Sequence, residues 1–248
     1  MLSSLISNLF YARLGGMNAS RTARERARAE LTREIKEEAR RQVAAEGAQR
    51  LSLRAVARHL GMVSSAVYRY FPSRDSLLTA LIIDAYDSLG EAAEAADRCQ
   101  PRPYLRSRWR AICQAVRNWA AASPHEYALI YGSPVPGYQA PRETIEPASR
   151  AALVLGRLLT DAWAGHAIID GPAGPPLSPL LAEQASALAA AIAPEVPGIV
   201  ILRGLIAWTQ LFGMISFEMF GQFVGTVDPG DDFFGHAVEQ MADFAGLP

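Results

Sequence analysis

The chain of 248 residues is long enough for one large or two modest domains with a sizeable core. Its residues are 50% hydrophobic and 20% charged, with a net charge of −1, which argues against a disordered chain and against a uniformly basic coat protein. The charge is unevenly placed: residues 1–80 carry 14 Lys and Arg against 7 Asp and Glu, whereas residues 81–248 carry 10 against 18. We infer a polyanion-binding module joined to a part that does not bind polyanions.

The first residues do not have the pattern of a signal peptide. The stretch before Met17 is mildly apolar, but it lacks a basic start, a sustained apolar run and a small-residue cleavage site. Strong helical patterning begins only later. We therefore expect residues 1–20 to be a disordered or non-native extension, with translation starting at Met1 or at Met17.

The basic third of the chain predicts several short helices. Apolar residues at four-residue steps predict a helix over 31–46, which Gly47 can end. Ser52 can cap a second helix, and Gly61 ends it after about two turns. A third helix follows over roughly residues 64–70. Two short helices joined around a glycine describe a helix-turn-helix.

The third helix carries the side chains best suited to contact DNA. Ala66, Val67 and Phe71 can face inward, which leaves the polar residues outside or at the rim. A helix fits the major groove, roughly 12 Å wide, where small hydroxyls allow close approach and an arginine can reach a guanine edge or a phosphate. The outward set is Ser64, Ser65, Tyr68, Arg69 and Tyr70.

Four arginines precede the first patterned helix, at Arg21, Arg24, Arg26 and Arg28. Arginines on a flexible arm suit phosphates or a narrow minor groove, and we expect such an arm here. Because Glu25 and Glu30 interrupt the run, a solvated charged face is the alternative.

The run from Leu51 to Leu78, LSLRAVARHLGMVSSAVYRYFPSRDSLL, resembles the tetracycline-repressor-like family of transcriptional regulators. In that family a Ser or Thr opens the second helix and a Gly makes the turn. A Tyr, an aromatic residue or His, and then a Phe precede a Lys or Arg that opens the fourth helix. These places are held here by Ser52, Gly61, Tyr68, Tyr70, Phe71 and Arg74. Val63 and Ser65 depart from the usual Ser and Gly, so no base preference follows.

The resemblance implies roles for individual residues. It implies phosphate contacts from Ser52, Arg54, Tyr68, Tyr70 and Arg74. It places Ser64, Ser65 and Arg69 nearest the bases. For Tyr68 and Tyr70 a packing role in the small helical core is the alternative.

From about residue 103 the pattern changes to long, Ala-rich helices separated by Pro/Gly clusters, and strand signals are almost absent. The predicted helices are 104–122, 124–131, 147–166, 179–193, 198–224 and 231–246. We therefore predict an all-α protein with a helix-turn-helix domain over 21–75, a connecting helix over 76–102 that Ser73 caps, and a helical sensing and dimerisation bundle over 103–248. The Pro/Gly-rich segment 170–179 is expected to be a mobile loop.

Aromatic residues recur through the predicted bundle. Most should be core, and the remainder are candidates for an apolar effector pocket. We name as pocket candidates Trp119, Tyr127, Trp163, His166, Trp208 and Phe212. The bundle is also similar to a subgroup with a Trp-His-Gly signature, through Trp208 and Gly213 with Phe212 in place of the His, and through the run YALIYGSPVPGY.

The most apolar stretch, residues 198–225, carries polar residues at intervals and is expected to be a buried interface helix rather than a membrane span. We predict a two-fold homodimer through the helices at 198–224 and 231–246. Small residues such as Gly204 and Gly213 would allow close approach. The contact would be filled by Leu205, Trp208, Phe212 and Phe220.

Other chemistry is poorly supported. A single pair of cysteines, Cys99 and Cys113, cannot build a framework of disulfide bridges. Both are expected to be free thiols in a reducing cytoplasm. The four histidines have no metal-ligand spacing, so no metal and no cofactor are predicted. An all-helical enzyme using Glu218 or His166 is the weakest alternative, because activating neighbours are not evident.

The prediction from the sequence is thus a cytoplasmic, non-enzymatic, homodimeric regulator, most simply a repressor. Its expected partners are double-stranded DNA, as a palindromic operator, and a small apolar effector that releases it. The fourth helix enters the bundle without a Gly/Pro linker, so it can couple the two sites. An architectural DNA-binding protein without an effector is the second hypothesis.

Overall fold

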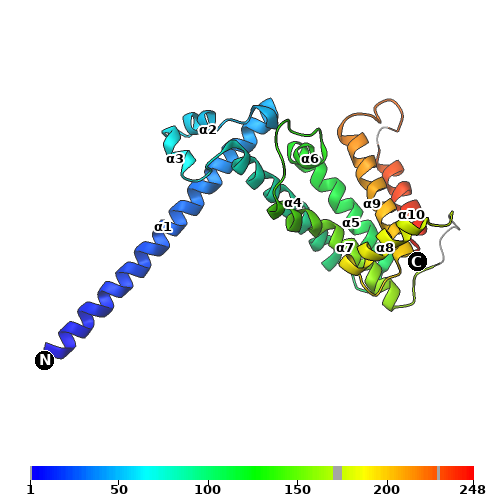
Figure 1. The fold of residues 1–248 in the computed structure, drawn as a ribbon, viewed down its shortest axis with the longest axis horizontal. Helices are drawn as coiled ribbons and strands as arrows, with labels where there is room; N and C mark the ends of the chain where they lie inside the picture. The colour runs from blue at the N-terminus through cyan, green and yellow to red at the C-terminus, as the bar shows by residue number, and fades with distance from the viewer. Residues whose placement is uncertain (1, 170–174, 228–229) are drawn as a thin grey trace. The chain divides into compact units, whose positions relative to one another are not determined.

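The computed structural model describes the backbone of residues 2–169, 175–227 and 230–248, and side chains from Thr22 onward within these ranges. Every regular element in these ranges is a helix (Figure 1). The all-α prediction is therefore confirmed. The chain divides into two compact units, residues 1–81 and 82–248.

The first unit is a short helical bundle. Its elements are α1 (Leu2–Glu46), the 3-10 turn η1 (Ala48–Arg50), α2 (Leu53–His59), α3 (Ser64–Tyr68) and the start of α4 (Arg74–Arg98). Ile35, Val56, Val67 and Leu77 are fully buried and bring the four helices together around one core. The stabilisation of such short helices comes mainly from this burial rather than from helix propensity.

Local signals explain where these helices begin and end. Gly47 follows α1 with φ of 83°, a left-handed conformation that glycine adopts without strain. The Ser52 hydroxyl accepts a hydrogen bond from the Ala55 amide at 3.4 Å, and the Ser73 hydroxyl accepts one from the Ser76 amide at 3.0 Å. Both predicted caps are thus confirmed.

We expected the four arginines before the first patterned helix to lie on a flexible arm. This prediction is wrong for the three whose side chains are described. Arg24, Arg26 and Arg28 lie on α1, with exposed side chains, because the helix begins well before the first apolar stripe. The side chain of Arg21 lies outside the described residues. The extension over residues 1–20 stays a prediction.

The second unit consists of longer helices that follow α4 in the chain. They are α5 (Leu105–Ala122), α6 (Pro124–Tyr131), the 3-10 turn η2 (Arg142–Thr144), α7 (Ile145–Ala164), α8 (Pro179–Ile192), α9 (Gly198–Met219) and α10 (Asp231–Ala245). Within it α9 packs against α5, α7, α8 and α10. Residues 170–174 of the predicted mobile loop lie outside the described residues.

One helix is shorter than predicted. We expected a helix over 198–224, but α9 ends at Met219, and Gly221 has φ of 74°. The Gln222 amide donates to the Phe217 carbonyl at 2.7 Å, which closes the helix end. By length and composition alone α9 could cross a membrane. However, 44% of its most apolar 18-residue stretch is buried inside the protein, and the core helix of a soluble protein has the same length and composition.

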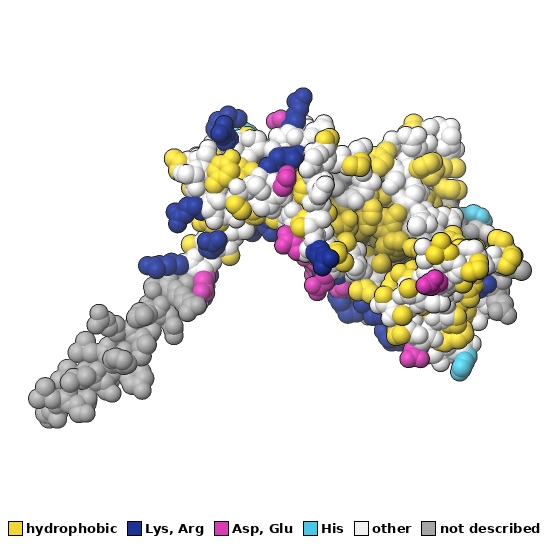
Figure 2. Space-filling model, viewed as in Figure 1, with side chains coloured by type: hydrophobic (Ala, Val, Ile, Leu, Met, Phe, Trp, Pro, Cys, Tyr) yellow, Lys and Arg dark blue, Asp and Glu magenta, His cyan; other side chains and the backbone are white. Residues whose placement is uncertain are grey.

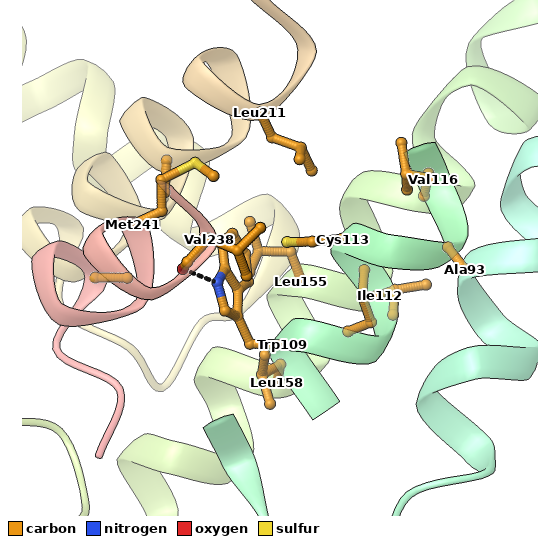
Figure 3. Close-up of a cluster of buried hydrophobic side chains, with 14 of the residues drawn as sticks. Ala93, Trp109, Ile112, Cys113, Val116, Leu155, Leu158, Leu211, Val238 and Met241 are labelled. Carbon is orange, nitrogen blue, oxygen red and sulfur yellow. Dashed lines mark hydrogen bonds between the residues drawn. The ribbon is translucent and has the colours of Figure 1, made fainter. Parts of the chain in front are cut away.

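The core of the second unit is centred on Trp109. This side chain is fully buried, and its indole N–H donates to the Val238 carbonyl at 2.8 Å (Figure 3). Cys113, Leu155 and Met241 lie around it in the same view. Both cysteines are free, and burial raises the pKa of the Cys113 thiol well above its usual range, which makes it unreactive.

A buried ion cluster ties α5 to its neighbours. Arg108 is fully buried and donates from Nε and Nη2 to the Asp97 carboxylate at 2.8 and 3.2 Å. Its Nη1 donates to Asp161 at 2.7 Å and to the Arg102 carbonyl at 3.1 Å. The cluster joins the end of α4 to α5 and α7.

Candidate nucleic-acid interface

The helices α2 and α3 form the predicted helix-turn-helix. Gly61 makes the turn with φ of 65°, and the Met62 amide donates to the Ala57 carbonyl at 2.8 Å. Val67 is fully buried and Phe71 nearly so, which fixes the inner face of α3. The other face of α3 is therefore free to approach DNA.

The predicted base-contacting residues lie on this outer face. Ser65 and Arg69 are exposed, and Ser64 is half-buried at the first position of α3. Tyr68 is 43% exposed, and Arg54 projects from α2 into solvent. The helix brings hydroxyl, phenol and guanidinium groups to one surface, as contacts with base edges and with phosphates require.

Tyr70 is partly covered by an arginine of α1. The guanidinium carbon of Arg28 lies 5.1 Å from the centre of the Tyr70 ring, a cation–π arrangement. The contact places a basic side chain of α1 next to the end of α3. Figure 2 shows Lys and Arg side chains spread over the first unit.

Ser52 and Arg74 are held by the protein itself. The Ser52 amide donates to Gln42 Oε1 at 3.4 Å, and its hydroxyl caps α2. Arg74 donates to the Ala48 carbonyl at 3.0 Å and to Asp75 at 3.2 Å, with 29% of its side chain exposed. Both side chains are therefore held in place by hydrogen bonds within the protein. Their contacts with phosphate stay a prediction.

A buried carboxylate in the first unit was missed by the sequence reasoning. Glu38 on α1 is almost fully buried; it lies 2.6 Å from His59 Nδ1 on α2 and 2.9 Å from an Arg41 guanidinium nitrogen. It follows Ile35 by three positions, so it shares the inner stripe of α1. The pair His59–Glu38 anchors the end of α2 against α1.

The second unit contains an open cavity of about 960 Å³. Its walls are α4 from Ile82 onward, the end of α6, the loop 132–140, η2 with the first half of α7, and the end of α8. Apolar side chains dominate, among them Ile82, Ile130 and Ile192. The space is within the range of small-molecule sites, roughly 300–1,000 Å³.

None of the six predicted pocket residues lines this cavity. Trp119 is nearly buried and donates to the Ser88 hydroxyl at 3.0 Å, which makes it a core residue. Trp163 is 39% exposed near the end of α7, and His166, just beyond it, is exposed with φ of 50°. A role for these three residues in binding an effector stays untested.

The other three pocket candidates meet in one aromatic cluster. Phe212 lies 4.6 Å from Trp208 between ring centroids, and the Tyr127 hydroxyl donates to the Phe212 carbonyl at 3.1 Å. Tyr131 joins them, 5.2 Å from Tyr127 and 6.3 Å from Tyr86, a cavity residue. The cluster thus borders the cavity through Tyr86 without forming its wall.

The sequence did not predict this cavity, because few residues in its wall are of types that indicate a binding pocket. Small side chains such as Ala148, Ser149 and Ala152 form one side, and the loop 132–140 forms another. The run YALIYGSPVPGY that supplies this loop was the available signal. No group of three or more His, Cys, Asp or Glu placed to hold a metal ion occurs among the described residues.

Comparison with protein families gives two matches along the chain. Residues 35–81 match "Bacterial regulatory proteins, tetR family", and residues 109–241 match "Tetracyclin repressor-like, C-terminal domain". The chain belongs to the TetR family. The first match covers the α2–α3 surface, and the second covers most of the second unit.

Relatives of the TetR-family chain agree with this assignment. The HTH-type transcriptional regulators Rv1816 of Mycobacterium tuberculosis and Mb1846 of Mycobacterium bovis are each 42% identical over 220 residues, covering 84% of this chain and 89% of the relative. The crystal structure of regulatory protein SCO4313 has a TM-score of 0.69 at 33% identity, covering 88% of this chain and 97% of that one. The protein is a transcriptional regulator with a DNA-binding helix-turn-helix.

Proposed function

We propose that the protein is a cytoplasmic, homodimeric repressor that binds a palindromic operator through α3 and leaves it when a small apolar molecule fills the cavity of the second unit. The observation that carries the DNA-binding part is the outer face of α3, where Ser65, Tyr68 and Arg69 are exposed beside Arg54 of α2. These side chains supply both base and phosphate contacts.

The dimer is supported by an unpaired apolar stripe on α9. Ile199, Ile206 and Phe217 recur at helical spacing on α9 and, with Phe220 just past its end, are 44–55% exposed; Gly213 between them faces open space. A second copy of the chain would cover this stripe by a two-fold contact. Such a dimer presents two α3 helices to half-sites about one helical turn apart, or more.

Two residues that we expected in this interface face inward instead. Phe212 is 8% exposed within its own unit, and a Cβ on Gly204 would lie 2.7 Å from Leu159 of the same chain. The predicted contact is corrected accordingly: Leu205 and Phe220 stay candidates, while Phe212 and Gly204 belong to the core.

Transmission between the sites is assigned to α4. This helix is continuous from Arg74 to Arg98; Leu77 and Leu78 are buried in the first unit, and Ile82 and Tyr86 line the cavity in the second. A ligand that displaces the cavity end of a rigid helix also displaces its other end. The cavity favours this sensor over an architectural DNA-binding protein without an effector.

A nuclease footprint on the DNA that flanks the gene tests the DNA-binding proposal. The full chain should protect a site with dyad symmetry, and sedimentation should give a dimer at micromolar concentration. Phe217→Glu, on the exposed stripe, should shift sedimentation towards the monomer while its melting stays cooperative. A protected site without symmetry, or a monomeric wild-type protein, would overturn the dimer.

A further inference from the structure

The cavity in the second unit has a wall of nearly uniform chemistry. Ile82, Leu129, Val135 and Ile192 supply branched apolar surface from four separate segments. Ile145, also in the wall, is 61% exposed, so an apolar side chain there is left in contact with water. A ligand that covers such surface gains free energy in proportion to the apolar area removed from water.

The polar groups of the wall are few and almost all neutral. Tyr86 and Tyr138 lie near each other, and burial, with a smaller contribution from the Tyr138 phenol, raises the pKa of Tyr86. Ser133 and Ser149 add hydroxyls. The exposed carboxylate of Glu146, in the first turn of α7, is the one charged group among the described lining residues.

No Lys, Arg or His occurs among the described residues that line the cavity. The arginine nearest in sequence, Arg150, is occupied: it donates to Glu94 at 2.9 and 3.2 Å and to Asp87 at 2.8 Å. The amino end of α7 borders the cavity and would by itself favour an anion. Glu146 occupies that first turn, and Pro147 removes one of its N–H donors.

We infer that the cavity takes a hydrophobic molecule that is neutral or singly cationic, and that it discriminates against hydrophobic anions such as carboxylates. An anion here would meet a carboxylate and find no cationic side chain among the described lining residues, whereas a cation can pair with Glu146 at the mouth while its apolar body covers the wall. The inference rests on the proposed role of this cavity as the effector site.

Three probes of equal chain length test the ligand class: decyltrimethylammonium, decanol and decanoate. Each is titrated calorimetrically into the full chain, the two ionic probes below their micelle concentrations and decanol below its solubility limit. The ammonium probe should bind about tenfold more tightly than decanoate. Glu146→Gln should weaken the ammonium probe about two- to fivefold, the effect of one exposed ion pair, and leave decanol unchanged. The matched control is Glu143→Gln, an exposed carboxylate outside the wall, which should change neither probe.

A second variant fixes the location of binding. Ala152→Phe fills the wall on α7 and should weaken all three probes, with cooperative melting as the check on folding. Equal or tighter binding of decanoate, binding of no probe, equal effects of Glu146→Gln and Glu143→Gln, or full binding by Ala152→Phe would each overturn the inference. Operator release is measured separately: if the ammonium probe binds as expected and operator affinity does not change, the ligand class stands and the effector role fails.

Discussion

The ring of Tyr131 on α6 lies 4.4 Å, centroid to centroid, from the ring of Phe212 on α9. Phe212 continues the contact to Trp208, and Tyr131 meets Tyr86 edge-on at the cavity wall. Offset and edge-to-face pairs of this kind each add to the free energy of burial. The row of rings therefore couples the packing of α9 to the residues around the cavity.

Phe212→Ala should lower the free energy of unfolding by about 3–5 kcal/mol, because it leaves a void between Tyr131 and Trp208. Phe212→Leu keeps much of the volume and should cost less. Urea unfolding followed by circular dichroism measures both. A loss below about 1 kcal/mol for the Ala variant would show that the site collapses and that the rings are not a packed unit.

Arg108→Met should lower the free energy of unfolding by about 3–5 kcal/mol, because it leaves the carboxylates of Asp97 and Asp161 without their buried partner. Arg102→Met is the matched control, since Arg102 pairs with the same Asp161 but is 68% exposed. Its loss should be about 0–1 kcal/mol. Equal losses in thermal or urea unfolding would contradict the assignment of the cluster as a buried network.

Glu239 should contribute to stability in a pH-dependent way. Hydrogen bonds from Arg110 and then Arg106 lower its pKa from 4.5 to about 2. Because the folded pKa lies below the unfolded value, this stabilisation is present above about pH 4.5 and is lost as the pH falls towards 2. Glu239→Gln should cost roughly 1–2 kcal/mol at pH 7, allowing for solvent screening, and the difference should shrink at pH 3. Parallel stability curves across this range would contradict the cause given for the shift.

Insertion of Gly-Gly after Leu81 should uncouple the two units. The insertion breaks α4 between Leu78, which is buried in the first unit, and the cavity residues Ile82 and Tyr86, so a displacement at the cavity is no longer carried to the first unit by one rigid element. The variant should still bind operator. In a coupled regulator a ligand typically lowers operator affinity about 5–150-fold, a coupling free energy of about 1–3 kcal/mol. In the variant the cavity ligand should leave operator affinity nearly unchanged. Operator binding titrated with and without ligand gives the coupling; an unchanged ratio would exclude α4 as the transmitting element.

Much of the fold could be predicted because local rules decide it. The four-residue apolar steps over residues 31–46 place the end of α1, and the cap at Ser52 and the Pro/Gly breaks place most later helices within a few residues of their observed bounds. The start of α1 was predicted wrongly, because the helix extends far ahead of its apolar stripe. The end of α9 is different. Its apolar pattern continues past Met219, but the helix ends there and Gly221 adopts a left-handed conformation.

The site was predictable only in part. The outer residues of α3 follow from which side chains a short helix must bury, so Ser65 and Arg69 could be placed. The cavity depends on how α4, α6 and α7 pack, which no local pattern fixes. Trp119 was a natural pocket candidate, but tertiary packing placed it in the core, and small residues such as Ala152 line the cavity instead.

Arg69→Ala should affect DNA binding differently from Arg54→Ala. Arg69 is exposed at the end of α3, where a guanine contact would make its loss cost about 1–3 kcal/mol on operator and relax one position of the site. Arg54 on α2 is expected to contact phosphate, so its loss should weaken operator and random DNA alike. Equal losses on both DNAs for Arg69→Ala would assign Arg69 to phosphate.

Operator reading by α3 is tested most directly by the affinity of the full chain for the footprinted site and for a scrambled duplex over a series of salt concentrations. The log of the binding constant should fall with log salt by about 0.9 per phosphate contacted on both duplexes, and operator should be bound about 10³-fold or more tightly than the scrambled duplex. Arg69→Ala should reduce that preference while the second unit stays folded. Equal affinity of the wild-type protein for the two duplexes at every salt concentration would contradict the claim that α3 reads an operator.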